Sequence, residues 1–138
     1  MIPRRRVAIT GIGMVTPVGH DAPATWASVC AGRSGSAAIR SFDASSFPTR
    51  IGAEVKDFNA AARINDRKLL KHASRSVRFA LAAAAEAFAD AGIRPEPHNA
   101  HRWGFSVGAG MMSVTLDELQ TVHGFCGRDG EFNAAGLV

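Results

Sequence analysis

The chain has 138 residues, of which 46% are hydrophobic and 20% are charged, a balance typical of one globular domain or of part of one. Its formal net charge of +4 favours an acidic partner, because opposite charges steer an encounter. Nucleic acid is not the partner that we expect, since the basic residues are spread along the chain, tyrosine is absent and no zinc-finger or RNP motif is present.

Two cysteines, Cys30 and Cys126, are too few for a disulfide framework and fit a reducing cytosol. The arginines at positions 4–6 could open a signal peptide, but glycines and Pro17 break the apolar run that follows them. No stretch reaches the roughly eighteen apolar residues of a membrane span. The sequence therefore predicts a cytoplasmic protein without a membrane segment.

The first predicted element is an apolar strand over residues 6–10, which runs into a turn rich in glycine, threonine and proline. Gly11 and Gly13 would allow another backbone to approach closely. Pro17 would end the strand, because it has no N–H group to donate.

A helix is predicted next, with Asp21 as its cap, Pro23 in its first turn and Gly32 at its end. Residues 33–48 contain too many turn-forming residues for regular structure. Residues 50–55 alternate well enough to predict a short strand.

A helical region follows, which Asn65 or Asp66 can cap. From Ser74 a helix is indicated by a stripe of apolar residues at spacings of three and four, formed by Val77, Leu81, Ala84, Ala85 and Phe88. Gly92, with Pro95 behind it, is a standard C-terminal stop.

Residues 103–107 then predict a short apolar strand bounded by glycines, and a partial apolar stripe over residues 114–123 predicts a helix that Gly124 ends. Strands thus alternate with helices. The sequence predicts an α/β fold with a largely parallel sheet.

Five blocks, in order and in spacing, resemble the β-ketoacyl-acyl-carrier-protein synthases that elongate acyl chains. They are TGIGMVTPVG at residues 10–19, Trp26 before AGRSG at 31–35, FD at 42–43, VKDFN at 55–59 and ADAGI at 89–93. The resemblance implies a thiolase-like fold, in which two similar halves form αβαβα layers. Residues 1–138 would form part of the N-terminal half, as a single partial domain.

The family that the chain resembles performs a decarboxylative Claisen condensation in fatty-acid or polyketide-like synthesis. A cysteine takes an acyl group from a carrier protein, and two histidines act on a malonyl thioester. In relatives the cysteine lies in a Thr-Ala-Cys-type elbow downstream of the matched region. Cys126 lacks that context, and Cys30 is expected at a mid-helix position that an apolar residue could fill.

The resemblance therefore implies no catalytic residue within this chain, no condensation by the chain alone, and no cofactor. It also implies acyl carrier protein as partner and a homodimer for the full-length family. The alternative is a short noncatalytic relative that binds acyl carrier protein or completes another synthase subunit.

A wall of the acyl pocket is the first site that the resemblance implies. Residues 108–113, GAGMMS, match the family's Gly-x-Gly-Ile-Gly-Gly stretch, in which the residue at the position of Met111 gates the pocket. The predicted pocket residues are Gly108, Gly110, Met111 and Met112. The match departs at residues 112–113, where relatives often have glycine, and a core-filling methionine is the alternative for Met111.

A basic cluster is the second predicted site. It consists of Arg67, Lys68, Lys71 and His72, with Arg63 and Arg75 nearby. In relatives this helical region meets the acidic carrier protein, and opposite charge would speed encounter and orient docking in a salt-dependent way. The alternative is a solvated helix face.

Two other signals are too weak to predict a site. The glycines at 11 and 13 lack the third glycine of a dinucleotide-binding motif, because Thr16 occupies its place. His98 with His101, and His123 with Cys126, have spacings that a metal could use, but each pair lacks the further ligands that zinc requires. We predict no metal site.

Overall fold

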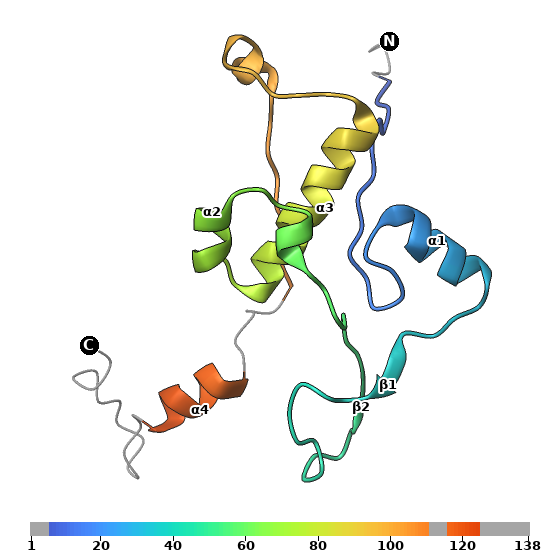
Figure 1. Ribbon diagram of the computed structural model, residues 1–138, viewed down its shortest axis with the longest axis vertical. Helices are drawn as coiled ribbons and strands as arrows, with labels where there is room; N and C mark the ends of the chain where they lie inside the picture. Colours follow the sequence, from blue (N-terminus) through green and yellow to red (C-terminus); the bar gives the residue numbers. More distant parts are fainter. Residues whose placement is uncertain (1–5, 111–115, 125–138) are drawn as a thin grey trace, which may run out of the picture. The chain divides into compact units, whose positions relative to one another are not determined.

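The computed structural model describes residues 6–110 and 116–124, in two units that divide between Ser106 and Val107 and that are considered separately. The first unit contains α1 (Ala22–Cys30), β1 (Ser36–Ala38), β2 (Ile51–Ala53), the 3-10 turn η1 (Ala60–Ala62), α2 (Arg67–His72), α3 (Arg75–Ala91) and the 3-10 turn η2 (Pro97–Arg102) (Figure 1). The second contains α4 (Leu116–Gly124). None of the helices in the described ranges is long and apolar enough to cross a membrane.

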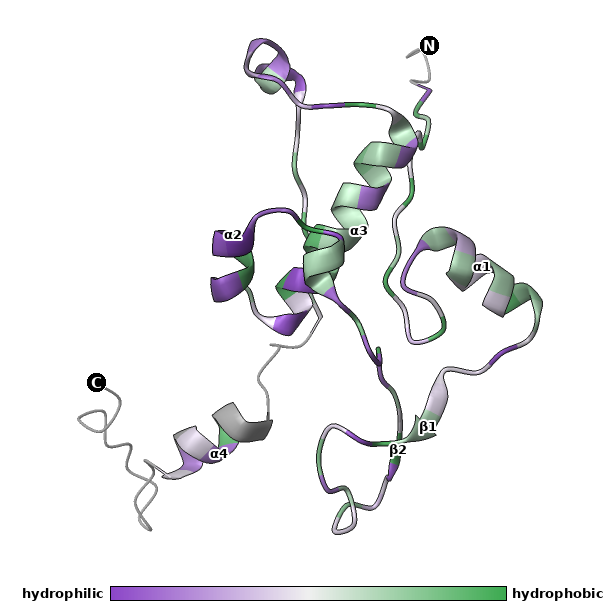
Figure 2. Ribbon diagram, viewed as in Figure 1, coloured by the Kyte–Doolittle hydropathy of each residue, from purple (hydrophilic) through white to green (hydrophobic). Residues whose placement is uncertain are grey.

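The longest described helix is α3, and its sequence explains both of its ends. The Ser74 hydroxyl accepts a hydrogen bond from the Val77 N–H at 3.4 Å, and Gly92 adopts a left-handed φ of 63°. Between them an alanine-rich body has high helix propensity, and most of its residues are hydrophobic (Figure 2). The predicted helix and both of its ends are confirmed.

A small core forms where η1 packs on α3. Ala82 of α3 is 2% exposed, and Ala60 and Ile64 are also buried against it. Partly buried apolar side chains surround these three, namely Val15, Phe58, Leu70 and Leu81. This core fixes η1 against α3 and thereby positions the segment that leads into α2.

Residues 6–10 do not form the predicted strand. Val7 is 93% exposed and Ile9 is 84% exposed, and no other described segment pairs with them. A strand requires a partner for its backbone hydrogen bonds, and an apolar run does not supply one.

Residues 11–14 lie along α3 instead (Figure 1). A Cβ atom added to Gly11 would collide with the carbonyl oxygen of Ala87, and one added to Gly13 would collide with that of Ala83. The predicted close approach of another backbone at both glycines is therefore confirmed, and that backbone belongs to α3.

Two carboxylates of α3 bind the backbone of the same segment. The Ile12 N–H donates to Asp90 Oδ2 and the Met14 N–H donates to Glu86 Oε2, both at 2.9 Å. The second oxygen of Glu86 accepts from the Ala22 N–H at 2.7 Å. Side chains one helical turn apart thus replace the acceptors that a partner strand would provide.

Helix α1 begins as predicted, because Asp21 Oδ1 accepts from the Ala24 N–H at 2.8 Å. Its buried residues are polar: the hydroxyls of Thr25 and Ser28 donate to backbone carbonyls in the preceding turn. Cys30 is the last residue of the helix and is exposed, which corrects the expected mid-helix position.

The sheet formed by the described residues has two strands, β1 and β2, which are antiparallel with Ser36 opposite Ala53. Strand β2 lies within the predicted strand at residues 50–55. Strand β1 lies in residues 33–48, for which the sequence predicts no regular structure, and its small residues become a strand through pairing with β2. The expected parallel sheet is not formed among these residues, whereas the mixture of helices and strands is as predicted.

Residues 103–107 also form no strand in the structure. Trp103 packs on Phe88 of α3, with ring centroids 5.7 Å apart, and its indole N–H donates to Asn99 Oδ1 at 2.8 Å. Phe105 is 88% exposed. One side chain anchors this stretch, and its backbone has no partner strand among the described residues.

In the second unit, α4 falls largely where the sequence predicts a helix and ends at Gly124, as expected. The predicted start at Val114 lies outside the described residues.

Candidate functional site

The residues of the predicted basic cluster lie on α2, a helix of six residues. It begins after Asp66, whose Oδ1 accepts from the N–H groups of Lys68 and Leu69 at 2.9 and 3.0 Å. One of the two predicted caps is thus confirmed. The helix ends at Ala73, where the backbone becomes extended.

Arg78 of α3 holds the C-terminal end of α2. Its Nε donates to the carbonyl of Ala73 and its Nη2 donates to the carbonyl of Leu70, both at 3.0 Å. A cation at this end also suits the helix dipole. Helix α2, although short, is therefore tied to α3 through a side chain as well as through the core.

The side chains of the basic cluster on α2 are exposed. They are Arg67, Lys68, Lys71 and His72. None of them forms an ion pair with another residue of the described ranges. Arg63, by contrast, is 2.9 Å from Asp21 Oδ2 and links η1 to the start of α1. The cations of α2 are thus not paired with a carboxylate of the described part of the chain, although Asp66 caps the first turn of the helix.

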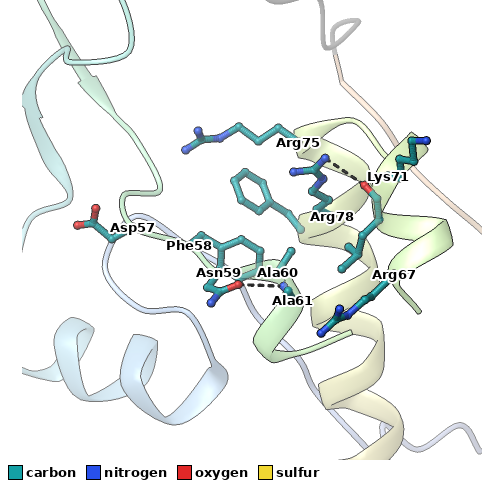
Figure 3. Close-up of a pocket in the computed structure, with 11 residues that line it drawn as sticks. Asp57, Phe58, Asn59, Ala60, Ala61, Arg67, Lys71, Arg75 and Arg78 are labelled. Atoms are coloured by element: carbon teal, nitrogen blue, oxygen red, sulfur yellow. Dashed lines mark hydrogen bonds between the residues drawn. The ribbon is translucent and has the colours of Figure 1, made fainter. Parts of the chain in front are cut away.

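An open cavity of about 720 Å³ lies beside α2 (Figure 3). Its apolar lining includes Phe58, Leu70, Phe79 and the two alanines Ala60 and Ala61. The rings of Phe58 and Phe79 meet edge to face, with centroids 5.1 Å apart and planes at 77°. These two rings form an apolar floor.

Four cationic side chains border this cavity, namely Arg67, Lys71, Arg75 and Arg78. Two of them are already engaged, since Arg75 donates to the Val55 carbonyl and lies 5.4 Å from the Phe79 ring centroid, and Arg78 binds the end of α2. Arg67 and Lys71 remain available to a partner. Lys68 and His72 do not line the cavity, although they lie on the same helix.

Asp57 is the carboxylate that lines this cavity, and Figure 3 shows it at the opposite end from Arg67 and Lys71. Its φ of 52° lies in the left-handed region, which aspartate tolerates better than most residues do. The cation-rich end of the cavity is therefore distinct from its acidic end.

The cavity residues that the sequence does not predict as site residues include Phe58, Phe79 and Arg78. Phe58 is visible within the block VKDFN, but that block carries only the family resemblance. Phe79 and Arg78 lie on the same helix as the apolar stripe, and nothing local reveals that η1 folds back beside them.

One carboxylate near the site has a perturbed pKa. The hydrogen bond from the Ala24 N–H, followed by that from Arg63, lowers the pKa of Asp21 below its ordinary value of 3.8. Asp21 is therefore held in its charged form as both the cap of α1 and the partner of Arg63.

The predicted acyl-pocket residues are only partly described. Gly108 and Gly110 are exposed, and an added Cβ at either would meet nothing within 4 Å. Met111 and Met112 lie outside the described residues. The pocket assignment stays a prediction.

The weak metal signals gain no support from the described residues, which contain no group of three or more histidine, cysteine or acidic side chains that could hold a metal ion. His98 instead lies 3.1 Å from Glu96 Oε2. Cys126 lies outside the described residues.

Comparison with solved structures defines the class of protein. The structure is similar to "The ishigamide ketosynthase/chain length factor", with a TM-score of 0.60 and 36% identity, over 67% of this chain and 23% of that chain. The described helices and strands thus correspond to the N-terminal portion of a thiolase-like ketosynthase fold, which confirms the fold expected from the resemblance.

The chain belongs to the β-ketoacyl synthase family: the family model "Beta-ketoacyl synthase, N-terminal domain" matches residues 4–132. It is 43% identical over 108 residues to the 3-oxoacyl-[acyl-carrier-protein] synthase 2 of Coxiella burnetii, and the match covers 78% of this chain and 26% of that protein. It is 39% identical over 120 residues to the tetracenomycin polyketide synthase ketoacyl synthase beta subunit of Streptomyces glaucescens, which covers 86% of this chain and 29% of that protein. The chain therefore spans little more than a quarter of the length of these relatives.

Proposed function

We propose that the exposed cations of α2 dock an acyl carrier protein, in a β-ketoacyl synthase that acts in fatty-acid or polyketide-like synthesis. The reaction would be the decarboxylative Claisen condensation of an acyl thioester with malonyl carrier protein. Helix α2 would supply the docking surface, and the nucleophilic cysteine and the histidine pair would come from elsewhere in the synthase.

The observation that supports this proposal is the group of exposed cations on α2 that form no ion pair with the described residues. Arg67 and Lys71 are one turn apart, as are Lys68 and His72. Like charges at this spacing destabilise a helix by roughly 0.2–0.5 kcal/mol per pair when both are charged. An anionic partner would relieve that repulsion, which supports docking over a merely solvated face.

Binding of the acyl carrier protein, measured by titration calorimetry at several salt concentrations, tests the proposal. Replacing both Arg67 and Lys71 with glutamine should weaken binding roughly fivefold at low salt and reduce its salt dependence. The matched control replaces Arg33 and Arg50, two exposed arginines away from α2, with glutamine. Equal losses in the two double variants would contradict specific docking on α2.

The runner-up is a short noncatalytic relative that binds acyl carrier protein or completes another synthase subunit. One observation favours it: the relatives include a protein named as a ketoacyl synthase beta subunit and a structure named as a ketosynthase/chain length factor. The intact mass of the natively expressed product separates the two. A mass of 14.5 kDa would support the short relative, and a mass several times larger would rule it out. In the larger product, the presence of the nucleophilic cysteine would support the synthase, and its absence would support a noncatalytic subunit.

We further propose that Gly108, Gly110, Met111 and Met112 contribute to the wall of the acyl pocket. The family membership of residues 4–132 supports this, because the glycine-rich stretch lies within the matched range. If it is correct, Met111→Ala in the native synthase should shift the preferred acyl-chain length, as measured by product distribution. An unchanged distribution would favour the core-filling role.

A further inference from the structure

The cavity beside α2 gives the proposed docking surface a second component that charge alone does not explain. We infer that the floor formed by Phe58 and Phe79 receives an apolar side chain, which the carrier protein presents next to its acidic residues. This inference rests on the proposed function, because it names how the same partner occupies the same surface.

Apolar and cationic side chains occupy different parts of the cavity. Aromatic and aliphatic side chains form the floor, and the cations stand around it (Figure 3). Figure 3 shows the side chains of Arg67 and Lys71 pointing in different directions rather than toward a common point. A small free anion would need donors that converge on it. The arrangement instead suits a larger surface that places acidic groups at the rim and an apolar group at the centre.

The rigidity of the floor is a further argument. Phe58 is held between His20 and Phe79, with ring centroids at 5.5 and 5.1 Å. The Arg75 guanidinium lies over the Phe79 ring. The cavity is thus formed before a partner arrives, so little ordering has to accompany binding.

Charge also decides the kind of occupant. The chain carries a net charge of +4, and a second copy would bring the same cations against Arg67 and Lys71. Self-association through this surface would therefore be repulsive, whereas an acidic carrier is complementary. We accordingly assign the cavity to the carrier protein and not to another copy of the chain.

Filling the cavity without changing any charge provides the test. Ala61 lines the cavity and Ala62, its neighbour in the same turn, is exposed and does not. We expect Ala61→Trp to lower affinity for the acyl carrier protein about tenfold, because the apolar contact is lost. Ala62→Trp should leave affinity unchanged. The salt dependence of binding should persist in Ala61→Trp, since Arg67 and Lys71 remain.

The outcomes separate this inference from the docking proposal. If Ala61→Trp binds like the unaltered protein while the Arg67 and Lys71 double variant binds weakly, the apolar anchor is wrong and docking on α2 stands. Equal losses in Ala61→Trp and Ala62→Trp also overturn the anchor. If neither the cavity variant nor the charge variant weakens binding, both proposals fail. Circular dichroism verifies folding, and Ala61→Leu provides a smaller filling group should the tryptophan variant not fold.

Discussion

Residues 11–14 and residues 103–106 both lack regular secondary structure and both contain glycine, yet they meet α3 in different ways. In the first stretch backbone lies against backbone at Gly13, and carboxylates of α3 bind the N–H groups. In the second a single side chain, Trp103, packs on the helix, and Gly104 has open space around it. Backbone contact depends on the absence of a Cβ atom and on acceptors that replace a neighbouring strand, whereas side-chain contact imposes neither condition.

The two stretches should differ most in the change of the free energy of unfolding when one methyl group is added to each. Gly13→Ala places a Cβ atom against the carbonyl of Ala83 and within 2.8 Å of the Ala87 nitrogen, so the segment must move away from α3. We expect a loss of about 1–3 kcal/mol in the free energy of unfolding, measured with urea.

The matched change at the other stretch is Gly104→Ala. Nothing lies within 4 Å of the added atom there, so stability should be unchanged or should rise by about 0.5 kcal/mol through the unfolded state. Similar losses in the two variants would show that the close approach at Gly13 does not distinguish the stretches.

Replacing the carboxylates of α3 that bind residues 11–14 should have the next largest effect on stability. Glu86 accepts two backbone N–H groups and Asp90 accepts one. Glu86→Gln should therefore cost about 1–2 kcal/mol, and Asp90→Asn should cost about half of that, since an amide oxygen is a weaker acceptor than a carboxylate. Hydrogen exchange at the Met14 amide should accelerate in the first variant. A larger loss from Asp90→Asn would contradict this assignment.

Local chemistry predicts much of this fold, and the outcome at particular residues shows where it stops. The caps Asp21, Asp66 and Ser74 and the stop at Gly92 lie within a few residues of what they bind, so the sequence reveals them. The strands predicted at residues 6–10 and 103–107 depend on partners remote in sequence. Apolar runs identify a segment that could pair, but they do not show that a partner is present.

The same distinction holds for the candidate site. Arg67 and Lys71 are neighbours on one helix, so their basic cluster is visible in the sequence. The floor of the cavity joins Phe58, near η1, to Phe79 on α3, across a fold that brings the two segments together. Arg67 and Lys71, the cations that remain available, could therefore be predicted, whereas Arg78 and the apolar half of the site could not.

A smaller effect should follow from weakening the side-chain anchor of residues 103–106. Trp103→Phe retains a ring against Phe88 but removes the indole N–H that binds Asn99. We expect a loss of about 0.5–1 kcal/mol in thermal or urea unfolding. Trp26→Phe is the control, because Trp26 is 69% exposed and its indole makes no hydrogen bond to the described residues. A comparable loss in the control would assign the effect to tryptophan content in general.

The smallest expected effect is a dependence of stability on pH at the turn that follows residues 11–14. The pKa of Asp21 is lowered by the Ala24 N–H and then by Arg63, so the unfolded chain takes up a proton on this group more readily than the folded one. Its contribution to stability is fully present above the ordinary value of 3.8 and is lost as pH falls through the lower folded value. Asp21→Asn keeps a residue that can cap α1 but removes the titration. The free energy of unfolding, measured with urea, should therefore fall less steeply between about pH 5 and pH 2 in Asp21→Asn than in the unaltered chain. Parallel curves for the two proteins would show that Asp21 does not supply this pH dependence.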